Sequence, residues 1–344
     1  MERIPLFNPT GSDLLTDRKI IGGNPTNLFN LNSSKYTWAV GLYKLMRFNQ
    51  WFPDKVDMSQ DITDYKQLSD YERNVFDNII SFLSFLDSLQ FNNLPHIADY
   101  ITAPEIKAAL QAQAMQETIH SESYQYILES VVAPDSRDSV LEMWRTNEDL
   151  KTRNTFIADI YNQFWDSSNK SSFANVLFAN YLLEGLYFYN GFNFFYSLAF
   201  NNKMRGTSEE IRYIHRDENS HRLLFSYIIK GIKEENPSFF DTDACLDMIK
   251  TAVEHEISWT NSIIPTNLLG INPTNTSQYS KYLANNLLID IGLDPIYSSS
   301  EASNPYSHLD SIANLNQGSI KSNFFESTVT NYSQASAIKG WDLI

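Results

Sequence analysis

Hydrophobic positions recur with the 3.6-residue period of α-helices along most of the chain, and few stretches alternate like β-strands. Four long helices are predicted, over 69–94, 102–132, 176–200 and 207–233. Further helices are predicted around 36–50, 150–165 and 242–264. Three of the long helices begin with a capping-box pattern, a Ser or Thr followed three residues later by Glu: Ser69 and Glu72, Thr102 and Glu105, Thr207 and Glu210. The pattern predicts an all-α protein.

The predicted helix over 176–200 is apolar on all sides, with Glu184 as its single charged residue. It is long enough to span a membrane, but Asn180, Asn190 and Asn193 would be unfavourable in lipid. The centre of a large helical bundle requires an apolar helix of this kind. We therefore expect a buried core helix and no membrane segment.

The composition shifts toward Ser, Asn and other small polar residues after about Tyr297. We predict one helical domain over 1–310 and a flexible tail over 311–344. The tail keeps scattered hydrophobic residues: Phe324, Phe325, Tyr332, Trp341, Leu343 and Ile344. Such a tail is either a peptide ligand for a partner or an ordinary disordered end.

Charge and cysteine content narrow the range of partners. A net charge of -15 repels the phosphates of nucleic acids and anionic lipids, so neither is expected as a partner. Cys245 is the only cysteine, which excludes an internal disulfide and fits a reducing compartment. The first residues lack the features of a secretory signal, so a cytoplasmic location is expected. A reaction that needs a pair of thiols must take them from another chain.

Two Glu-x-x-His motifs, Glu117 to His120 and Glu218 to His221, lie on separate predicted helices. Residues three apart on a helix differ by about 300° of rotation, so the side chains of each motif are neighbours and can bind one metal ion. A single motif of this kind usually marks a solvated helix face. Two of them favour a dinuclear centre in a bundle of long helices, with iron or manganese held mainly by carboxylates.

Two further carboxylates stand at matching places in apolar helices. Asp87 precedes the first motif by 30 residues, and Glu184 precedes the second by 34. A buried carboxylate without a partner is destabilising, and two metal dications would offset that effect. Glu122, about 140° around the helix from Glu117, is instead expected to face solvent or a neighbour. The remaining histidines are expected at the surface or in packing: His96, His215, His255 and His308.

Tyr124 follows the first motif by one helical turn on the same face. A tyrosine beside a high-potential metal centre can be oxidised, although Tyr124 by itself could be an ordinary core aromatic. Phe188, Phe192 and Ile214 are spaced by whole turns from the predicted ligands of their own helices. These three residues are predicted to wall a dry apolar pocket, which a phenoxyl radical needs in order to persist.

Four segments around these residues resemble the small subunit of class I ribonucleotide reductase: SFLSFLDSLQ, QETIHSESYQYIL, LLEGLYFYNGF and IHRDENSH. The similarity covers roughly residues 15–344, and all six ligand positions are filled. The resemblance implies a ferritin-like helical bundle, a homodimer and ribonucleoside-diphosphate reductase activity that requires a large subunit.

The resemblance divides the predicted ligands into two sets: Asp87, Glu117 and His120 for one metal ion, and Glu184, Glu218 and His221 for the other. Glu117 and Glu218 are the implied bridges. Asp87 and Tyr124 depart from the tyrosine-free manganese-iron members and favour two iron ions, with an oxo or hydroxo bridge derived from dioxygen. Two manganese ions with a flavoprotein activator are the alternative, since ligand types alone do not separate the two metals.

By the same resemblance, dioxygen and the metal centre generate a radical that Tyr124 stores. Trp51 corresponds to the tryptophan of the family's radical relay, and Asp217 corresponds to the aspartate that links it to the metal-bound His120. In the tail, Tyr332 would carry the radical into the large subunit, Glu326 would support that transfer, and the tail itself would dock on the large subunit. A cysteine of the large subunit would then start the reduction of ribonucleotides to deoxyribonucleotides.

Other ferritin-like proteins also use paired Glu-x-x-His motifs. A desaturase, a monooxygenase or a ligand-binding oxidase would need neither Tyr124 nor the pair of Trp51 and Asp217. Iron storage in a ferritin-like shell is a further alternative, against which the chain length and the aromatic tail argue.

Overall fold

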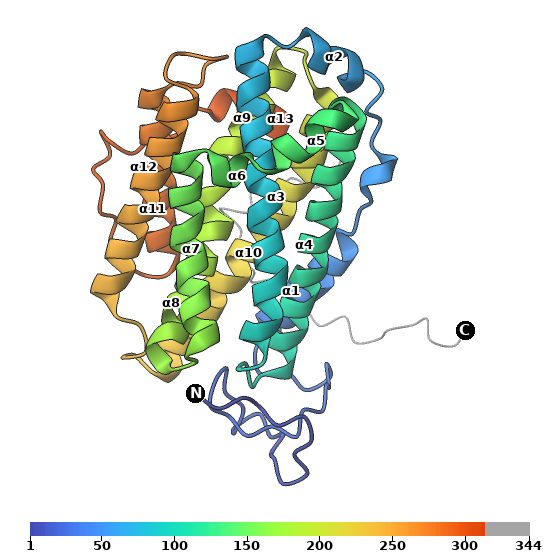
Figure 1. Ribbon diagram of the computed structural model, residues 1–344. Helices are drawn as coiled ribbons and strands as arrows, with labels where there is room; N and C mark the ends of the chain where they lie inside the picture. Colours follow the sequence, from blue (N-terminus) through green and yellow to red (C-terminus); the bar gives the residue numbers. More distant parts are fainter. Residues whose placement is uncertain (314–344) are drawn as a thin grey trace.

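The computed structural model describes residues 1–313 and confirms the predicted all-α fold (Figure 1). The helices that carry the site are α3 (Asp70–Ala98), α4 (Pro104–Val131), α8 (Lys170–Leu182), α9 (Tyr189–Phe200) and α10 (Arg205–Glu235). The other helices are α1 (Thr37–Phe48), α2 (Asp61–Gln67), α5 (Pro134–Leu141), α6 (Met143–Thr146), α7 (Glu148–Asp166), α11 (Thr242–Ile263), α12 (Pro273–Asp290) and α13 (Asp310–Ala313). The predicted tail lies outside the described residues from position 314 onward.

The long helices pack side by side around one apolar core. α3 packs along α4, α4 along α1, and α10 along α8 and α9. α11 and α12 pair with each other at one side of the bundle, drawn in orange in Figure 1. Residues 1–36 cross the lower end of the bundle in that view without forming a helix.

The sequence pattern did not predict α12, whose segment PTNTSQYSKYLANNLLID mixes polar and apolar residues. Its buried residues lie against α11, so tertiary packing stabilises a helix whose own hydrophobic period is weak. The short helices α2, α5, α6 and α13 were not predicted either. Apart from the segment 176–200, the predicted helices have counterparts that begin and end within a few residues of the predicted bounds.

The capping box at α3 is confirmed, but those predicted for α4 and α10 are wrong. The Ser69 hydroxyl accepts a hydrogen bond from the Glu72 amide at 3.2 Å, and the Glu72 carboxylate accepts one from the Ser69 amide at 2.9 Å. At the start of α4, Glu105 instead accepts hydrogen bonds from the buried Arg18 side chain. In α10, Thr207 donates to Asp61. Partners distant in sequence have therefore replaced the local caps.

The apolar segment 176–200 is confirmed as a core element, but it is not one continuous helix. α8 passes into a π-helical turn, η2 (Leu183–Tyr187), before α9 begins. Nearly every residue from 172 to 198 is buried. None of the helices between residues 1 and 313 combines the length and the hydropathy that crossing a membrane requires.

Gly185 permits the close packing of α12 against η2. A Cβ atom at this position would lie only 2.4 Å from Cδ2 of Leu287 on α12. The absence of a side chain therefore lets the two elements approach each other directly behind Glu184.

Candidate metal centre

Six side chains from four neighbouring elements meet in the middle of the bundle, and all of them are fully buried. They are Asp87 from α3, Glu117 and His120 from α4, Glu184 from η2, and Glu218 and His221 from α10. The three-residue spacing in α4 and α10 places each Glu beside its His, as predicted. The packing of α3, α4, η2 and α10 brings the two motifs and the two further carboxylates together.

The ligand atoms form two overlapping groups: Asp87, Glu117, His120 and Glu218, and Glu117, Glu184, Glu218 and His221. Within each group, one ligand atom per residue lies within 4.8 Å of all the others. Nδ1 of His120 lies 3.2 Å from Glu117 and 3.0 Å from Glu218. Nδ1 of His221 lies 3.1 Å and 2.9 Å from the same two carboxylates. Glu117 and Glu218 therefore stand between the two groups.

Many polar atoms of this cluster have no hydrogen-bond partner: both carboxylate oxygens of Asp87, one oxygen each of Glu117, Glu184 and Glu218, and Nδ1 of His120. Buried polar atoms are normally satisfied, and several unsatisfied ones converging on one place need a common explanation. Oxygen and imidazole nitrogen donors in this ratio suit hard or borderline dications. The residues fit a dinuclear metal centre.

The electrostatics of the cluster follow from four carboxylates placed in a dry interior. Burial raises the pKa of Asp87 and of Glu184 well above the usual range, and the neighbouring carboxylates Glu117 and Glu218 add to both shifts. Burial also acts to raise the pKa of Glu218, but a hydrogen bond with Glu184 and the charges of the two histidines bring it below the usual range. Metal binding would displace the protons that this crowding retains.

Trp51 and Asp217 are connected to the cluster through His120, as the resemblance implies. The Trp51 indole Nε1 donates a hydrogen bond to Oδ2 of Asp217 at 2.8 Å. The same oxygen lies 3.5 Å from Nε2 of His120, the ring nitrogen that faces away from the carboxylate cluster. Arg216 donates to the other Asp217 oxygen at 3.0 Å. Tyr213 stacks on Trp51 with ring centroids 5.0 Å apart, a contact that the sequence analysis missed.

A set of buried amides surrounds the carboxylates, and the sequence analysis did not include them in the site. Gln113 donates to Glu184 at 2.7 Å and to Glu117 at 3.1 Å, and Gln90 also donates to Glu184. Oε1 of Gln116 accepts a hydrogen bond from Nε2 of His221 at 3.0 Å. Amide side chains inside apolar helices were the available signal, because a buried amide needs a polar partner.

Tyr124 is fully buried, and its hydroxyl has no hydrogen-bond partner. Burial raises its pKa well above the usual range, and the negative charge of Asp87 adds to the effect. Phe188, Phe192 and Ile214 are buried as well. The arrangement of these three side chains around Tyr124 stays a prediction.

The remaining site predictions have mixed outcomes. Glu122 is exposed, which confirms that it faces away from the cluster. His308 is exposed, His96 and His255 are partly buried, and His215 packs between aromatic rings, so none of the four joins the cluster. Tyr332 and Glu326 lie outside the described residues, and their roles stay predictions.

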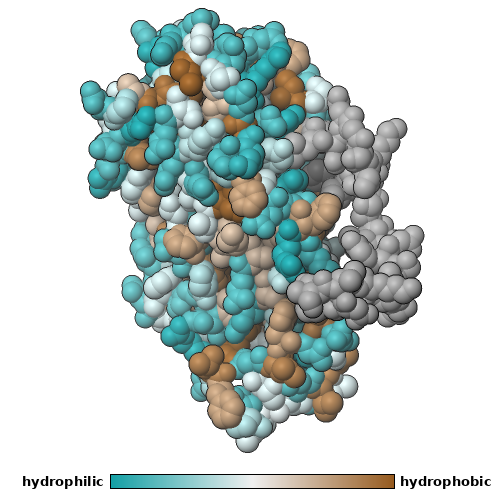
Figure 2. Space-filling view, turned by 90° about the vertical axis from the view of Figure 1, so that its right-hand side faces the viewer, coloured by the Kyte–Doolittle hydropathy of each residue, from teal (hydrophilic) through white to brown (hydrophobic). Residues whose placement is uncertain are grey.

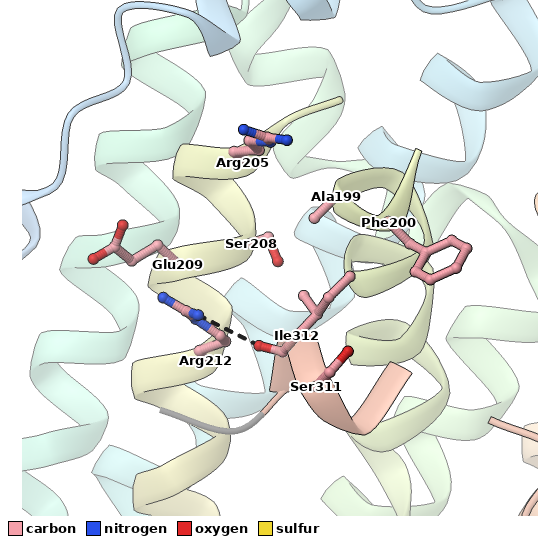
Figure 3. Close-up of a pocket in the computed structure, with 8 residues that line it drawn as sticks. All are labelled: Ala199, Phe200, Arg205, Ser208, Glu209, Arg212, Ser311 and Ile312. Atoms are coloured by element: carbon pink, nitrogen blue, oxygen red, sulfur yellow. Dashed lines mark hydrogen bonds between the residues drawn. The ribbon is translucent and has the colours of Figure 1, made fainter. Parts of the chain in front are cut away.

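The surface offers no second cluster of this kind in the described part of the chain. The face in Figure 2 is mostly hydrophilic with scattered hydrophobic residues, as the acidic composition leads one to expect. A shallow pocket lies between α9, α10 and α13 (Figure 3). Its lining residues are Ala199, Phe200, Arg205, Ser208, Glu209, Arg212, Ser311 and Ile312. None of these is a predicted site residue.

A helical bundle with two Glu-x-x-His motifs and a carboxylate from each of two further elements defines the ferritin-like dinuclear carboxylate proteins. The family model for "Ribonucleotide reductase, small chain" matches residues 28–305. The chain belongs to this family of ribonucleotide reductase small chains. The match favours that family over the oxidase and iron-storage alternatives.

Individual relatives agree with the family match. The chain is 41% identical over 342 residues to the ribonucleoside-diphosphate reductase subunit beta of Treponema pallidum, covering 98% of this chain and 97% of that one. It is 34% identical to the corresponding subunit of Halalkalibacterium halodurans, with 99% of each chain covered. The ribonucleotide reductase R2 subunit from Clostridium botulinum has a similar structure, with a TM-score of 0.87, 42% identity, and coverage of 92% of this chain and 99% of that one.

Proposed function

We propose that this chain is the radical-generating subunit of a ribonucleoside-diphosphate reductase and that it acts together with a large subunit. The observation that supports this function best is the buried six-residue cluster connected through His120 and Asp217 to Trp51. Family membership indicates the reaction, since the relatives in Treponema pallidum and Halalkalibacterium halodurans are named as ribonucleoside-diphosphate reductase subunits.

The six clustered residues would hold two metal ions, for which we propose iron, with manganese and a flavoprotein activator as the alternative. With dioxygen, such a centre supplies the oxidising power needed to remove an electron from a tyrosine. Metal analysis of protein isolated from its native host, together with an electron paramagnetic resonance spectrum, separates the two metals.

The chain's own residues would prepare Tyr124 for this oxidation. A phenol that loses an electron also loses its proton, and Asp87 is the carboxylate whose charge acts most strongly on Tyr124. We assign Asp87 as the acceptor for that proton. Full burial keeps water and reductants away from the ring. The predicted apolar residues Phe188, Phe192 and Ile214 would serve the same purpose.

Radical transfer toward the large subunit would begin at Trp51. Asp217 accepts the indole N–H and faces His120, so it can take up the proton when the ring is oxidised. Tyr332 and Glu326 would continue the route. The thiols that reduce the substrate would belong to the large subunit, because Cys245 is buried and burial raises its pKa to about 12.

The proposed function is tested by reconstitution. Metal-loaded protein exposed to dioxygen, or to the activator in the manganese case, should reduce a ribonucleoside diphosphate when mixed with the large subunit of the same organism. Neither subunit alone should do so. A mixture that stays inactive with both iron and manganese would contradict the proposal.

Removal of the last twenty residues should abolish binding to the large subunit while leaving the metal content unchanged. The reason is that the aromatic tail, and not the buried centre, is proposed to dock on the partner. Binding is measured by surface plasmon resonance, and metal content by elemental analysis of the same sample. Unchanged affinity of the truncated chain would refute tail docking.

We also propose that the chain forms a homodimer, and light scattering of the full-length protein checks this.

A further inference from the structure

A buried ion pair lies outside the candidate metal centre and joins two outer helices. Nε of Arg153 on α7 donates to Oε1 of Glu256 on α11 at 2.5 Å, and both side chains are fully buried. A buried ion pair is weak evidence for stability, because desolvation of the two charges offsets their attraction. The further contacts of Arg153 and Glu256 therefore indicate the role of the pair.

Arg153 contacts the π-helical turn that carries Glu184. Its Nη2 donates to the carbonyl oxygen of Tyr187, the last residue of η2. Its guanidinium lies 4.3 Å from the ring centroid of Phe82 and 4.4 Å from that of Tyr187. Where an α-helix passes into a π turn, the hydrogen-bond ladder shifts by one residue, and a carbonyl becomes available to an outside donor.

Glu256 holds the same segment just after the turn. Its Oε2 accepts a hydrogen bond from Nδ2 of Asn190, at the start of α9, at 3.0 Å. The Arg153–Glu256 pair thus binds the chain at Tyr187 and at Asn190, three and six residues after Glu184. The backbone on the C-terminal side of Glu184 is fixed from α7 and α11.

We infer that Arg153 is a positioning residue that holds the π-helical turn and thereby sets where the Glu184 carboxylate stands in the metal centre. Glu184 is the one ligand of the six that does not lie in an α-helix, so its backbone depends most on outside contacts. It belongs to the group with His221 and not to the group with Asp87 and His120. Loss of the contact should therefore affect one metal ion more than the other. This inference rests on the proposed dinuclear centre.

The variant Arg153→Lys tests whether the hydrogen bonds of Arg153, and not only its positive charge, position the π-helical turn. Lysine keeps a positive charge opposite Glu256, but its single ammonium cannot reproduce the planar fork that reaches Glu256 and the Tyr187 carbonyl together. Arg18→Lys is the matched control. Arg18 is also buried and pairs with Glu105 at 3.2 Å, and its other hydrogen bonds go to the N-terminal segment.

The metal-free full-length protein is titrated anaerobically with Mn²⁺, and unbound Mn²⁺ is counted from its electron paramagnetic resonance signal. Wild type and Arg18→Lys should bind two ions per chain with the same affinities. Arg153→Lys should bind one ion normally and the other about tenfold more weakly, which is the lower end of the effect of losing a direct hydrogen-bond partner of a metal ligand. Normal binding of both ions, or equal weakening of both, would overturn the inference. Failure of wild type to bind two ions would instead count against the proposed centre.

A second variant keeps the test decisive if Arg153→Lys does not fold. Arg153→Met combined with Glu256→Met removes both charges, so that neither is left buried alone. Hydrogen-deuterium exchange of the metal-free protein should then be faster over residues 183–191 than in Arg18→Lys. The Mn²⁺ titration should again show one weakened ion. Two normally bound ions in this variant would overturn the inference, whatever the exchange rates.

Discussion

Tyr124→Phe is expected to lower the rate of deoxyribonucleotide formation with the large subunit to background, while both metal ions remain bound. Phenylalanine lacks the O–H group whose electron and proton are removed in the proposed reaction. It fits the same buried space, since it differs from tyrosine only in lacking the hydroxyl. The folded structure should therefore change little. Turnover is measured by deoxyribonucleotide formation and metal content by elemental analysis.

Tyr126→Phe provides the comparison for this variant. Tyr126 lies on the same helix, two residues further on, and its hydroxyl donates to the backbone carbonyl of Val56 at 3.0 Å. This variant loses a hydrogen bond but no cluster residue, so it should retain activity. Electron paramagnetic resonance of the activated protein should show a tyrosyl signal in wild type and in Tyr126→Phe only. Turnover by Tyr124→Phe would exclude radical storage at this residue.

Glu117→Ala is expected to lower the metal content from two ions per chain to one or fewer. Glu117 lies between the two groups of ligand atoms, and its carboxylate is within 3.2 Å of both histidines. Alanine removes a ligand from both ions at once. Loss of an outer contact alone typically weakens metal binding by about 10- to 100-fold, and loss of a shared ligand should have a larger effect. Metal content is measured after desalting.

Glu122→Ala is the control on the same helix. Glu122 is exposed and faces away from the cluster, so its loss removes one charge from α4 without touching the centre. This variant should keep two ions and full activity. If Glu117→Ala also retained two tightly bound ions, the assignment of the cluster as the metal centre would be wrong.

Local spacing was sufficient to predict which side chains of a helix are neighbours. Glu117 and His120 are three residues apart and lie together, while Glu122 points elsewhere, because the rotation per residue of an α-helix is nearly constant. The same regularity is interrupted after Glu184, although Glu184 itself lies in the cluster as predicted. A π turn there inserts an extra residue, so that whole-turn spacing to Phe188 no longer describes the geometry.

Capping patterns show a second case in which a local sequence pattern does not predict the structure. Ser69 and Glu72 form the predicted reciprocal hydrogen bonds, but Thr207 binds Asp61 and Glu105 binds Arg18. These partners are separated from the capping residues by 146 and 87 positions. A pattern of four residues contains no information about such competitors, and the stronger tertiary interaction replaces the local one.

The helical class, the buried nature of the segment 176–200 and the carboxylate-rich ligand set of a dinuclear site could all be predicted from the sequence. These follow from hydrophobic period, helix geometry and ligand type, which are local properties of the chain. Three features emerge only when the helices pack together: Glu117 and Glu218 stand between the two groups of ligand atoms, buried amides contact Glu184, and the Arg153–Glu256 pair holds the π-helical turn. Those features depend on how separate helices pack, because they join side chains that are far apart in the sequence.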